Sequence, residues 1–125
     1  MRYLLDTHAI LWYVDANPDF PERLRDLIDT SDCVYSTASL WEIAIKQSQG
    51  KLRFNTSMQE LEALCRERDI RVLNIRSVEL ERLKTLPDVH RDPFDRLLVA
   101  QALESGLAIV TRDRIIPQYP VQTIW

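Results

Sequence analysis

Four acidic side chains stand where strands or helices are expected to begin or end, although they lie far apart along the chain. They are Asp6, Glu42, Asp95 and Asp113. Asp6 and Asp113 each follow an apolar run, and the other two lie in segments with a helical pattern. In an open parallel α/β sheet, ligands bind beyond the carboxyl ends of the strands, so such positions converge at one edge. The four carboxylates therefore predict one acidic pocket that binds a metal ion.

The chemistry of such a pocket follows from its ligand atoms. Carboxylate oxygens without a cysteine or an organised histidine set suit hard cations, Mg²⁺ or Mn²⁺, rather than zinc. A bound ion of this kind can activate water and offset charge on a phosphodiester during in-line displacement. His8 and His90 lie near two of the acids but lack metal-ligand spacing, so we favour supporting or capping roles over ligation for both. Metal-dependent phosphodiester hydrolysis is the leading hypothesis.

Each acid also has a structural explanation when it is taken alone. Asp6 could be the N-cap of the helix that follows it, and Asp113 could begin a turn. Ser39-x-x-Glu42 fits a capping box, and Lys46 stands four residues after Glu42 as a salt-bridge partner. The joint pattern favours a metal site, because carboxylates crowded at one sheet edge repel one another unless a cation neutralises them.

The segment around Asp95 is a good helix start. Asp92 fits the N-cap position, Pro93 the first helical position and Asp95 the third, where a carboxylate suits the helix dipole. Capping explains Asp92 more fully than Asp95. Thr7 and Thr111 could support the pocket by hydrogen bonds to a carboxylate or a metal-bound water, although threonines at element ends are usually local caps.

Basic and aromatic side chains near the acids could contact a nucleic acid. Four arginines flank the expected pocket in sequence and could hold substrate phosphates, although solvated charge or ion pairing explains any one of them equally well. They are Arg91, Arg96, Arg112 and Arg114. Trp12, Tyr13 and Trp41 could stack bases, but their place in apolar helical segments favours burial in the core or in a subunit interface.

Composition indicates one ordinary soluble domain over residues 1–125. Hydrophobic residues make up 46% of the chain and charged residues 28%, close to the averages for globular proteins. A net charge of −3 excludes a general basic surface, so any nucleic-acid contact must be local. The apolar runs are too short to span a bilayer, and the early Asp6 argues against a signal peptide, so we expect a cytoplasmic protein. Cys33 and Cys65 are expected to be buried free thiols.

Strand and helix patterns alternate along the chain. The expected strands cover residues 2–5, 33–36, 71–75, 108–111 and 121–125. The expected helices cover residues 9–14, a segment opened by residues 20–22, and residues 39–49, 58–68, 78–86 and 93–105. Gly50 and Gly106 are the expected helix stops. Alternation of this kind predicts a three-layer α/β/α sandwich with a central, mainly parallel sheet.

Four motifs in order resemble those of PIN-domain proteins, and more narrowly of the VapC-type toxins of type II toxin–antitoxin systems. They are Leu4-Leu5-Asp6-Thr7-His8, Ser39-Leu40-Trp41-Glu42-Ile43-Ala44-Ile45-Lys46, His90-Arg91-Asp92-Pro93-Phe94-Asp95-Arg96-Leu97-Leu98 and Val110-Thr111-Arg112-Asp113. The likeness covers nearly the whole chain. Four motifs in the right order are also much more specific than any single aspartate.

The resemblance implies a nuclease that cuts RNA with Mg²⁺ or Mn²⁺, often as a homodimer, and is restrained by a small cognate antitoxin of the VapB or Phd type. It implies that Asp6 and Asp95 are the strongest metal ligands. Glu42 would be a ligand or orient water, and Asp113 would act directly or through water. Asp92 matches the family's local sequence, and residues 114–120 fall in a region that varies in such proteins.

Two other functions compete with the nuclease. A haloacid-dehalogenase-like phosphatase also uses an aspartate after its first strand, but it requires Asp-x-Asp, whereas this chain has Asp6-Thr7-His8. A catalytically silent PIN-like binding module would use the same acidic pocket to receive an arginine from a partner. Enzyme and binding module separate when the isolated chain is assayed with metal.

Overall fold

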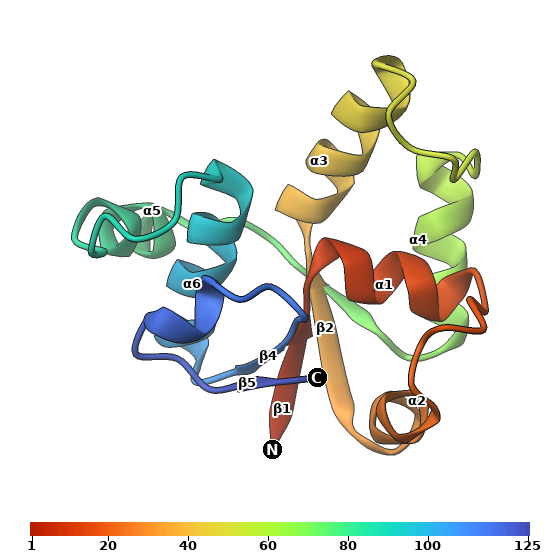
Figure 1. Ribbon diagram of the computed structural model, residues 1–125, viewed down its shortest axis with the longest axis horizontal. Helices are drawn as coiled ribbons and strands as arrows, with labels where there is room; N and C mark the ends of the chain where they lie inside the picture. The colour runs from red at the N-terminus through yellow and green to blue at the C-terminus, as the bar shows by residue number, and fades with distance from the viewer.

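Five parallel strands form the central sheet, and six α-helices cover its two faces (Figure 1). The computed structural model describes residues 1–125. The first half of the chain contains β1 (Arg2–Leu5), α1 (Thr7–Val14), α2 (Glu22–Thr30), β2 (Asp32–Ser36), α3 (Thr37–Ser48) and α4 (Met58–Glu67). The second half contains β3 (Arg71–Leu73), α5 (Ser77–Lys84), α6 (Pro93–Ser105), β4 (Ala108–Val110), a 3-10 turn (Ile116–Gln118) and β5 (Thr123–Ile124).

The strand order places β1 at the centre of the sheet. The order is β3-β2-β1-β4-β5, and Leu4 of β1 lies between Val34 of β2 and Ile109 of β4. Along the chain, β2 and β3 follow β1 on one side of it, and β4 and β5 then follow on the other side. The sheet therefore has a topological switch point between β1 and β4, where ligands bind in open α/β sheets.

Alternating side chains on the strands bury two separate cores. Leu5 and Tyr35 point to one face and pack with apolar residues of α1, α2, α3 and α4. Leu4, Val34 and Ile109 point to the other face and pack with residues of α6. Helices thus cover both faces, as Figure 1 shows, and the predicted three-layer α/β/α sandwich is confirmed, with a sheet that is entirely parallel.

The two glycines end helices as expected. Gly106 follows α6 in the left-handed conformation, with φ of 65°, and Gly50 follows α3 with φ of 66°. Residues with a side chain are strained in this backbone conformation, whereas glycine adopts it freely.

Cys33 and Cys65 are buried free thiols, as expected, and burial raises the pKa of each to about 11.

Several boundaries differ from the sequence prediction. The third helix begins at Thr37 rather than Ser39, because Ser36 is its N-cap and its Oγ accepts a hydrogen bond from Ala38 N. The proposed Ser39-x-x-Glu42 capping box is therefore wrong. The last strand is also shorter than predicted and contains only residues 123–124. No helix in the structure is long and apolar enough to span a membrane.

Two of the three aromatic side chains are buried as expected, and the third is not. Tyr13 is buried, and Trp12 packs partly buried against the same core. Trp41 has 59% of its surface exposed in the single chain, so it is not buried in the core, and burial in a subunit interface stays a prediction. On α3 the helical spacing places Ile43 inside, and Trp41, two positions earlier, points to the opposite side.

Candidate metal centre

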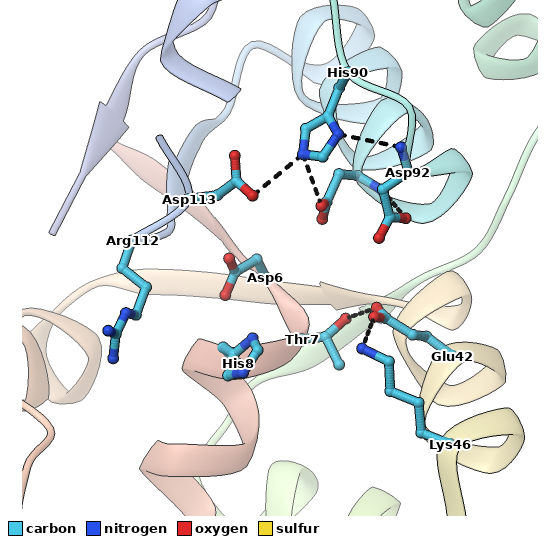
Figure 2. Close-up of a pocket in the computed structure, with 10 residues that line it drawn as sticks. Asp6, Thr7, His8, Glu42, Lys46, His90, Asp92, Arg112 and Asp113 are labelled. Atoms are coloured by element: carbon cyan, nitrogen blue, oxygen red, sulfur yellow. Dashed lines mark hydrogen bonds and ion pairs between the residues drawn. The ribbon is translucent and has the colours of Figure 1, made fainter. Parts of the chain in front are cut away.

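An open pocket of about 510 Å³ lies at the carboxyl edge of the sheet (Figure 2). None of its lining residues is hydrophobic. They are Asp6, Thr7, His8, Glu42, Lys46, His90, Asp92, Asp95, Arg112 and Asp113. The four acids expected to form the site therefore share one cavity.

Asp6 lies between β1 and α1, at the switch point of the sheet. Its Oδ1 accepts a hydrogen bond from Ala9 N at 2.8 Å, so the expected N-cap role is confirmed. The side chain is nevertheless open to the pocket. Burial raises the pKa of Asp6, which hydrogen bonds from Thr111 and Ala9 only partly offset. The same carboxylate thus caps a helix and faces the other acids.

Glu42 is held in place by two side chains. Thr7 Oγ1 donates a hydrogen bond to Glu42 Oε1 at 2.6 Å and lies 2.9 Å from Ser39 Oγ. Lys46 Nζ lies 2.7 Å from Glu42 Oε2, which confirms the expected i,i+4 salt bridge. The hydrogen bond from Lys46 to Glu42 is the main cause of the raised pKa of Lys46. Each oxygen of this carboxylate therefore has its own donor.

The start of α6 fixes Asp95 beside the other acids. Asp92 Oδ1 accepts hydrogen bonds from Phe94 N at 2.8 Å and Asp95 N at 3.3 Å, so Asp92 is the helix N-cap, as expected. Asp95 follows in the first helical turn and faces the pocket. Its pKa is raised to about 8, mainly by burial and then by the charges of Asp92, Asp113, Asp6 and Glu42.

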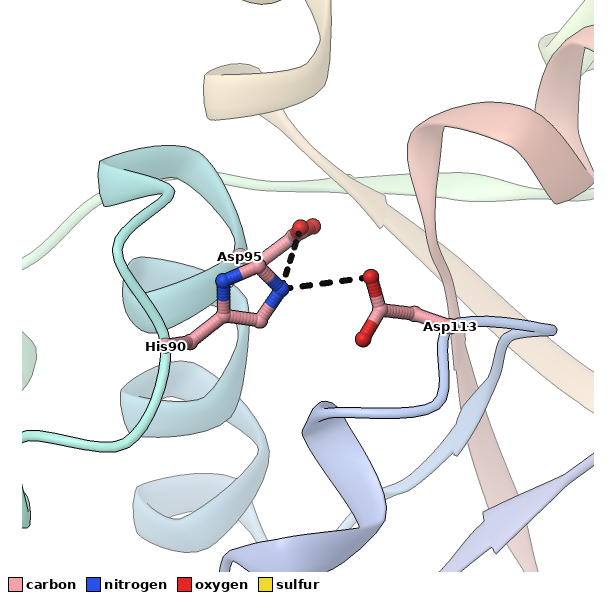
Figure 3. A group of neighbouring side chains, drawn as sticks. All are labelled: His90, Asp95 and Asp113. Carbon is pink, nitrogen blue, oxygen red and sulfur yellow. Dashed lines mark hydrogen bonds and ion pairs between the residues drawn. The ribbon is translucent and has the colours of Figure 1, made fainter.

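A histidine joins two of the acids (Figure 3). His90 Nε2 lies 3.1 Å from Asp95 Oδ2 and 3.2 Å from Asp113 Oδ2. Asp92 N donates a hydrogen bond to His90 Nδ1 at 3.1 Å, so in the neutral ring the proton resides on Nε2 and points at the two carboxylates. One nitrogen or oxygen atom from each of these three residues lies within 4.8 Å of the others, a spacing that suits a metal ion, but Nε2 would have to lose its proton before it could bind one.

Asp113 occupies a tight turn after β4. Its Oδ1 accepts hydrogen bonds from Ile115 N at 2.7 Å and Ile116 N at 2.9 Å, and its own N–H donates to Thr111 Oγ1. Burial tends to raise the pKa of Asp113, but these two backbone hydrogen bonds and His90 outweigh it, and the pKa is lowered. The turn therefore keeps one oxygen occupied and leaves Oδ2 facing the pocket.

The four arginines have different surroundings. Arg112 lines the pocket, and its guanidinium lies 5.2 Å from the ring centroid of Trp12. Arg96 is turned away and donates hydrogen bonds to the carbonyls of Leu83 and Pro87, where it anchors the chain before α6. Arg91 and Arg114 are exposed near the pocket in sequence but do not line it.

Sequence reasoning missed Tyr119. Its buried hydroxyl accepts hydrogen bonds from His90 N at 2.8 Å and from Arg96 at 3.2 Å, so Tyr119 holds the segment that carries His90. No spacing in the sequence marks this contact, because Tyr119 lies in a loop 29 positions after His90. Lys46 was expected only as a salt-bridge partner, yet it also lines the pocket.

The donor set fits a hard divalent cation. The pocket is lined by five carboxylates and two imidazoles, and it contains no thiol. Burial, and after it the negative charges of the neighbouring acids, raise the pKa of Asp95 to about 8, so a cation beside these acids would favour the charged form of Asp95. Oxygen-rich sites that crowd several carboxylates together suit Mg²⁺ or Mn²⁺, whose charge would offset the repulsion between these carboxylates.

Comparison with solved structures identifies several proteins that share this fold. A chain of VapBC2 from Rickettsia felis, crystallised bound to a DNA fragment from its promoter, superposes with a TM-score of 0.72 at 14% identity, over 99% of this chain and 98% of that one. DNA-bound VapBC from Salmonella typhimurium gives 0.68 at 17% identity, over 99% and 97%. FitAcB from Neisseria gonorrhoeae gives 0.66 at 18% identity, over 98% and 96%.

Sequence comparison identifies the family directly. No curated protein matches the sequence. The PIN domain family model matches residues 3–121, which include every residue that lines the pocket. The chain belongs to the PIN domain family.

Proposed function

We propose that this protein is a ribonuclease toxin of the VapC type, which hydrolyses RNA phosphodiester bonds with Mg²⁺ or Mn²⁺. The observation that carries the proposal is the convergence of Asp6, Glu42, Asp95 and Asp113 in one pocket without apolar lining. Burial and the negative charges of neighbouring acids raise the pKa of Asp95 to about 8. A bound cation would offset these negative charges. Membership of the PIN domain family supports the same chemistry.

Asp6, Asp95 and Asp113 would hold the metal, with Glu42 as a further ligand or a group that orients water. A bound ion would offset charge on the phosphodiester and lower the pKa of a water molecule. Thr7 and Lys46 fix Glu42, and the turn of Asp113 fixes the direction of its free oxygen. His90 donates toward Asp95 and Asp113 and so orients both carboxylates.

The basic groups would bind the substrate strand. Arg112 lies on one side of Asp6, opposite Glu42 and Lys46, as Figure 2 shows. Its contact with the Trp12 ring holds the guanidinium in place, where it could contact a phosphate next to the one that is cut. Arg91 and Arg114 are exposed and could extend this contact, whereas Arg96 serves to anchor the loop.

A small cognate antitoxin of the VapB or Phd type is the proposed partner. The similar folds include VapBC and FitAcB complexes, two of them crystallised with DNA, which supports a place in a toxin–antitoxin pair. An acidic pocket of this kind can also receive an arginine from the antitoxin, which would displace the metal.

We further propose that the protein forms a homodimer. Gel filtration over a range of concentrations tests this proposal, and a monomer at every concentration would contradict it.

The decisive assay uses the purified, antitoxin-free chain and total cellular RNA. The chain is incubated with Mg²⁺ or Mn²⁺, with EDTA and with the variant Asp95→Asn, and the cut ends are mapped by sequencing. Asn has nearly the shape of Asp, so this change removes a charge with little change in packing. We expect discrete cuts that disappear with EDTA and with Asp95→Asn and return when metal is added after EDTA.

A binding module gives a different result. The folded wild-type chain would then bind metal or an arginine-bearing partner but leave RNA intact. Cleavage that persists in EDTA, or that Asp95→Asn leaves unchanged, would point to a contaminating nuclease and contradict the proposed function. Thermal unfolding of both proteins in the same buffer shows that any loss of cleavage reflects chemistry rather than misfolding.

A further inference from the structure

An aromatic pair, exposed Trp41 and half-buried Phe94, directly precedes two of the acids that line the pocket. The ring of Trp41 on α3 contacts the ring of Phe94 on α6 edge to face, with centroids 5.2 Å apart and planes at 80°. Trp41 retains 59% of its surface exposed, although it makes this contact. A tryptophan side chain is usually much more buried, and such exposure of a large ring has a solvation cost.

Both aromatic residues are next in sequence to acids of the proposed metal centre. Trp41 immediately precedes Glu42, and Phe94 immediately precedes Asp95, and both acids line the pocket. The aromatic contact therefore joins the same two helices that supply these carboxylates. Because edge-to-face contacts favour a defined ring arrangement, Phe94 fixes Trp41 in orientation and leaves much of its surface accessible.

The surroundings argue for a small flat ligand rather than a protein surface. Apart from Met1, the other exposed large hydrophobic side chains lie between Val72 and Val89, outside α3. A stable protein interface buries about 800 Å² on each partner around an apolar centre. Trp41 is instead the one exposed large hydrophobic residue on its helix, and no hydrophobic residue lines the neighbouring pocket. One exposed ring packed on a half-buried Phe94 offers a stacking surface but is too small for an interface core.

We propose that Trp41, held by Phe94, is a stacking platform for an unpaired base of the RNA, next to the phosphate that enters the metal centre. This inference rests on the proposed function, because it assigns the ribonuclease a substrate with single-stranded character at the cut. Stacking on an aromatic ring is tolerant of sequence, since every base has a flat π-face. A base within a duplex is already stacked on its neighbours and cannot use the platform.

Arg112 gives the strand a second contact. Figure 2 places Arg112 and Glu42 on opposite sides of Asp6, and Trp41 directly precedes Glu42 in α3. A strand that crosses the pocket would meet a guanidinium on one side and an aromatic ring on the other. The phosphate between them would lie over the carboxylates. Phosphate contacts and base stacking together are the usual means of binding single strands.

Binding by short, fluorescently labelled strands tests the platform without cleavage. All variants carry Asp95→Asn and are measured in Mg²⁺ by fluorescence anisotropy with a uridine strand and with an abasic strand of equal length and charge. Trp41→Leu keeps an apolar side chain but removes the ring, and Trp41→Phe keeps a ring. Val78→Ala on α5 is the matched control, because Val78 is also exposed but does not line the pocket.

We expect Trp41→Leu to weaken binding of the uridine strand by roughly fivefold or more, and Trp41→Phe and Val78→Ala to change it by less than about twofold. The abasic strand should bind equally to all variants. Equal binding of the uridine strand by Trp41→Leu and its parent would overturn the proposal, as would no binding of either strand. An equal loss on both strands would also overturn it, because it would indicate a structural role.

Two further measurements separate this proposal from its alternatives. If Trp41→Leu leaves uridine binding intact but changes the elution of the protein in gel filtration, the ring belongs to an interface between copies of the chain, and the proposal is wrong. RNA cleavage by the chain with Asp95 and Trp41 intact reports on the proposed ribonuclease separately. Base-dependent binding without cleavage would refute the ribonuclease and leave the stacking platform in place.

Discussion

Asp95 has a strongly raised pKa because it is buried among other acids. The charges of Asp92, Asp113, Asp6 and Glu42 add to the effect of burial and raise its pKa from 3.8 to about 8. Asp113 shows the opposite shift, because two backbone hydrogen bonds and His90 stabilise its charged form. The two pKa values thus shift in opposite directions, because burial and neighbouring charges dominate at Asp95 and hydrogen bonds dominate at Asp113.

The raised pKa of Asp95 predicts an unusual pH dependence of stability. Between about pH 4 and pH 8 the folded metal-free chain keeps a proton on Asp95 that the unfolded chain has released. The contribution of this group to the free energy of unfolding therefore falls as the pH rises through that window. Asp95→Asn removes the effect and should stabilise the metal-free protein by about 1 kcal/mol near neutral pH. Thermal unfolding in EDTA at several pH values measures both effects.

The difference between the two proteins is the informative quantity, because other groups titrate in both. The gap in Tm between Asp95→Asn and wild type should widen from acid to neutral pH. A gap that stays constant, or a variant that is less stable at every pH, would contradict the account of Asp95.

Thr7 is expected to act on Glu42 rather than on the substrate. Thr7→Val replaces the hydroxyl that donates to Glu42 Oε1 at 2.6 Å with a methyl group of similar size. We expect metal-dependent cleavage to fall roughly tenfold, as is usual when a group that orients a ligand is lost. Thr7→Ser keeps the hydroxyl and should stay within about twofold of wild type. Equal activity of Thr7→Val and Thr7→Ser would show that the Thr7 hydroxyl does not contribute to cleavage.

At the scale of elements, helix starts and strand ends position the site. Asp6 caps α1 and Asp92 caps α6, so the backbone geometry that begins each helix also points acids into the pocket. Asp113 sits in a turn after β4, and Glu42 lies in α3 directly after β2. These elements surround the switch point between β1 and β4.

The N-cap of α6 can be separated from the charge of Asp92. Asp92→Ala removes the oxygen that accepts from Phe94 N and should lower the free energy of unfolding by about 1 kcal/mol. Asp92→Asn keeps a side-chain oxygen for the cap and removes the charge that raises the pKa of Asp95. Denaturant unfolding should rank wild type and Asp92→Asn above Asp92→Ala. Equal stability of the Ala and Asn variants would show that the cap contributes little.

Local sequence signals predicted most of the helices and strands, because each signal depends only on residues that are close together in the sequence. Asp92 and Pro93 at the start of α6, and Gly106 at its end, specify a helix without help from the rest of the chain. The start of α3 was misplaced because both Ser36 and Ser39 can cap a helix. Tertiary packing decides between them, since Ser39 is buried against Thr7.

Contacts between distant segments were not predictable in the same way. The carboxylates could be grouped because parallel α/β topology brings strand ends together. Tyr119 supports His90 through a hydroxyl contact that leaves no pattern in the sequence. Trp41 and Ile43 both lie in an apolar stretch, and only the packing of α3 shows that Ile43 is buried while Trp41 is exposed.

At the scale of the whole molecule, the two halves of the chain contribute different parts of one site. Asp6 and Glu42 come from the first half, with α1 and α3, and Asp95 and Asp113 come from the second, with α6 and the turn after β4. A bound divalent ion would bridge these parts. Because an ion that binds only the folded state adds to its stability, Mg²⁺ or Mn²⁺ should raise the Tm of the metal-free protein.

Binding of Mn²⁺ by the antitoxin-free chain tests the metal centre most directly. Free Mn²⁺ gives an electron paramagnetic resonance signal that is lost on binding, so a titration at neutral pH reports occupancy without any RNA. We predict that the wild-type chain binds Mn²⁺, that Mg²⁺ competes, and that Asp95→Asn weakens binding by roughly tenfold or more. A folded wild-type chain that leaves the signal of free Mn²⁺ unchanged, or that binds no better than Asp95→Asn, would contradict the metal centre.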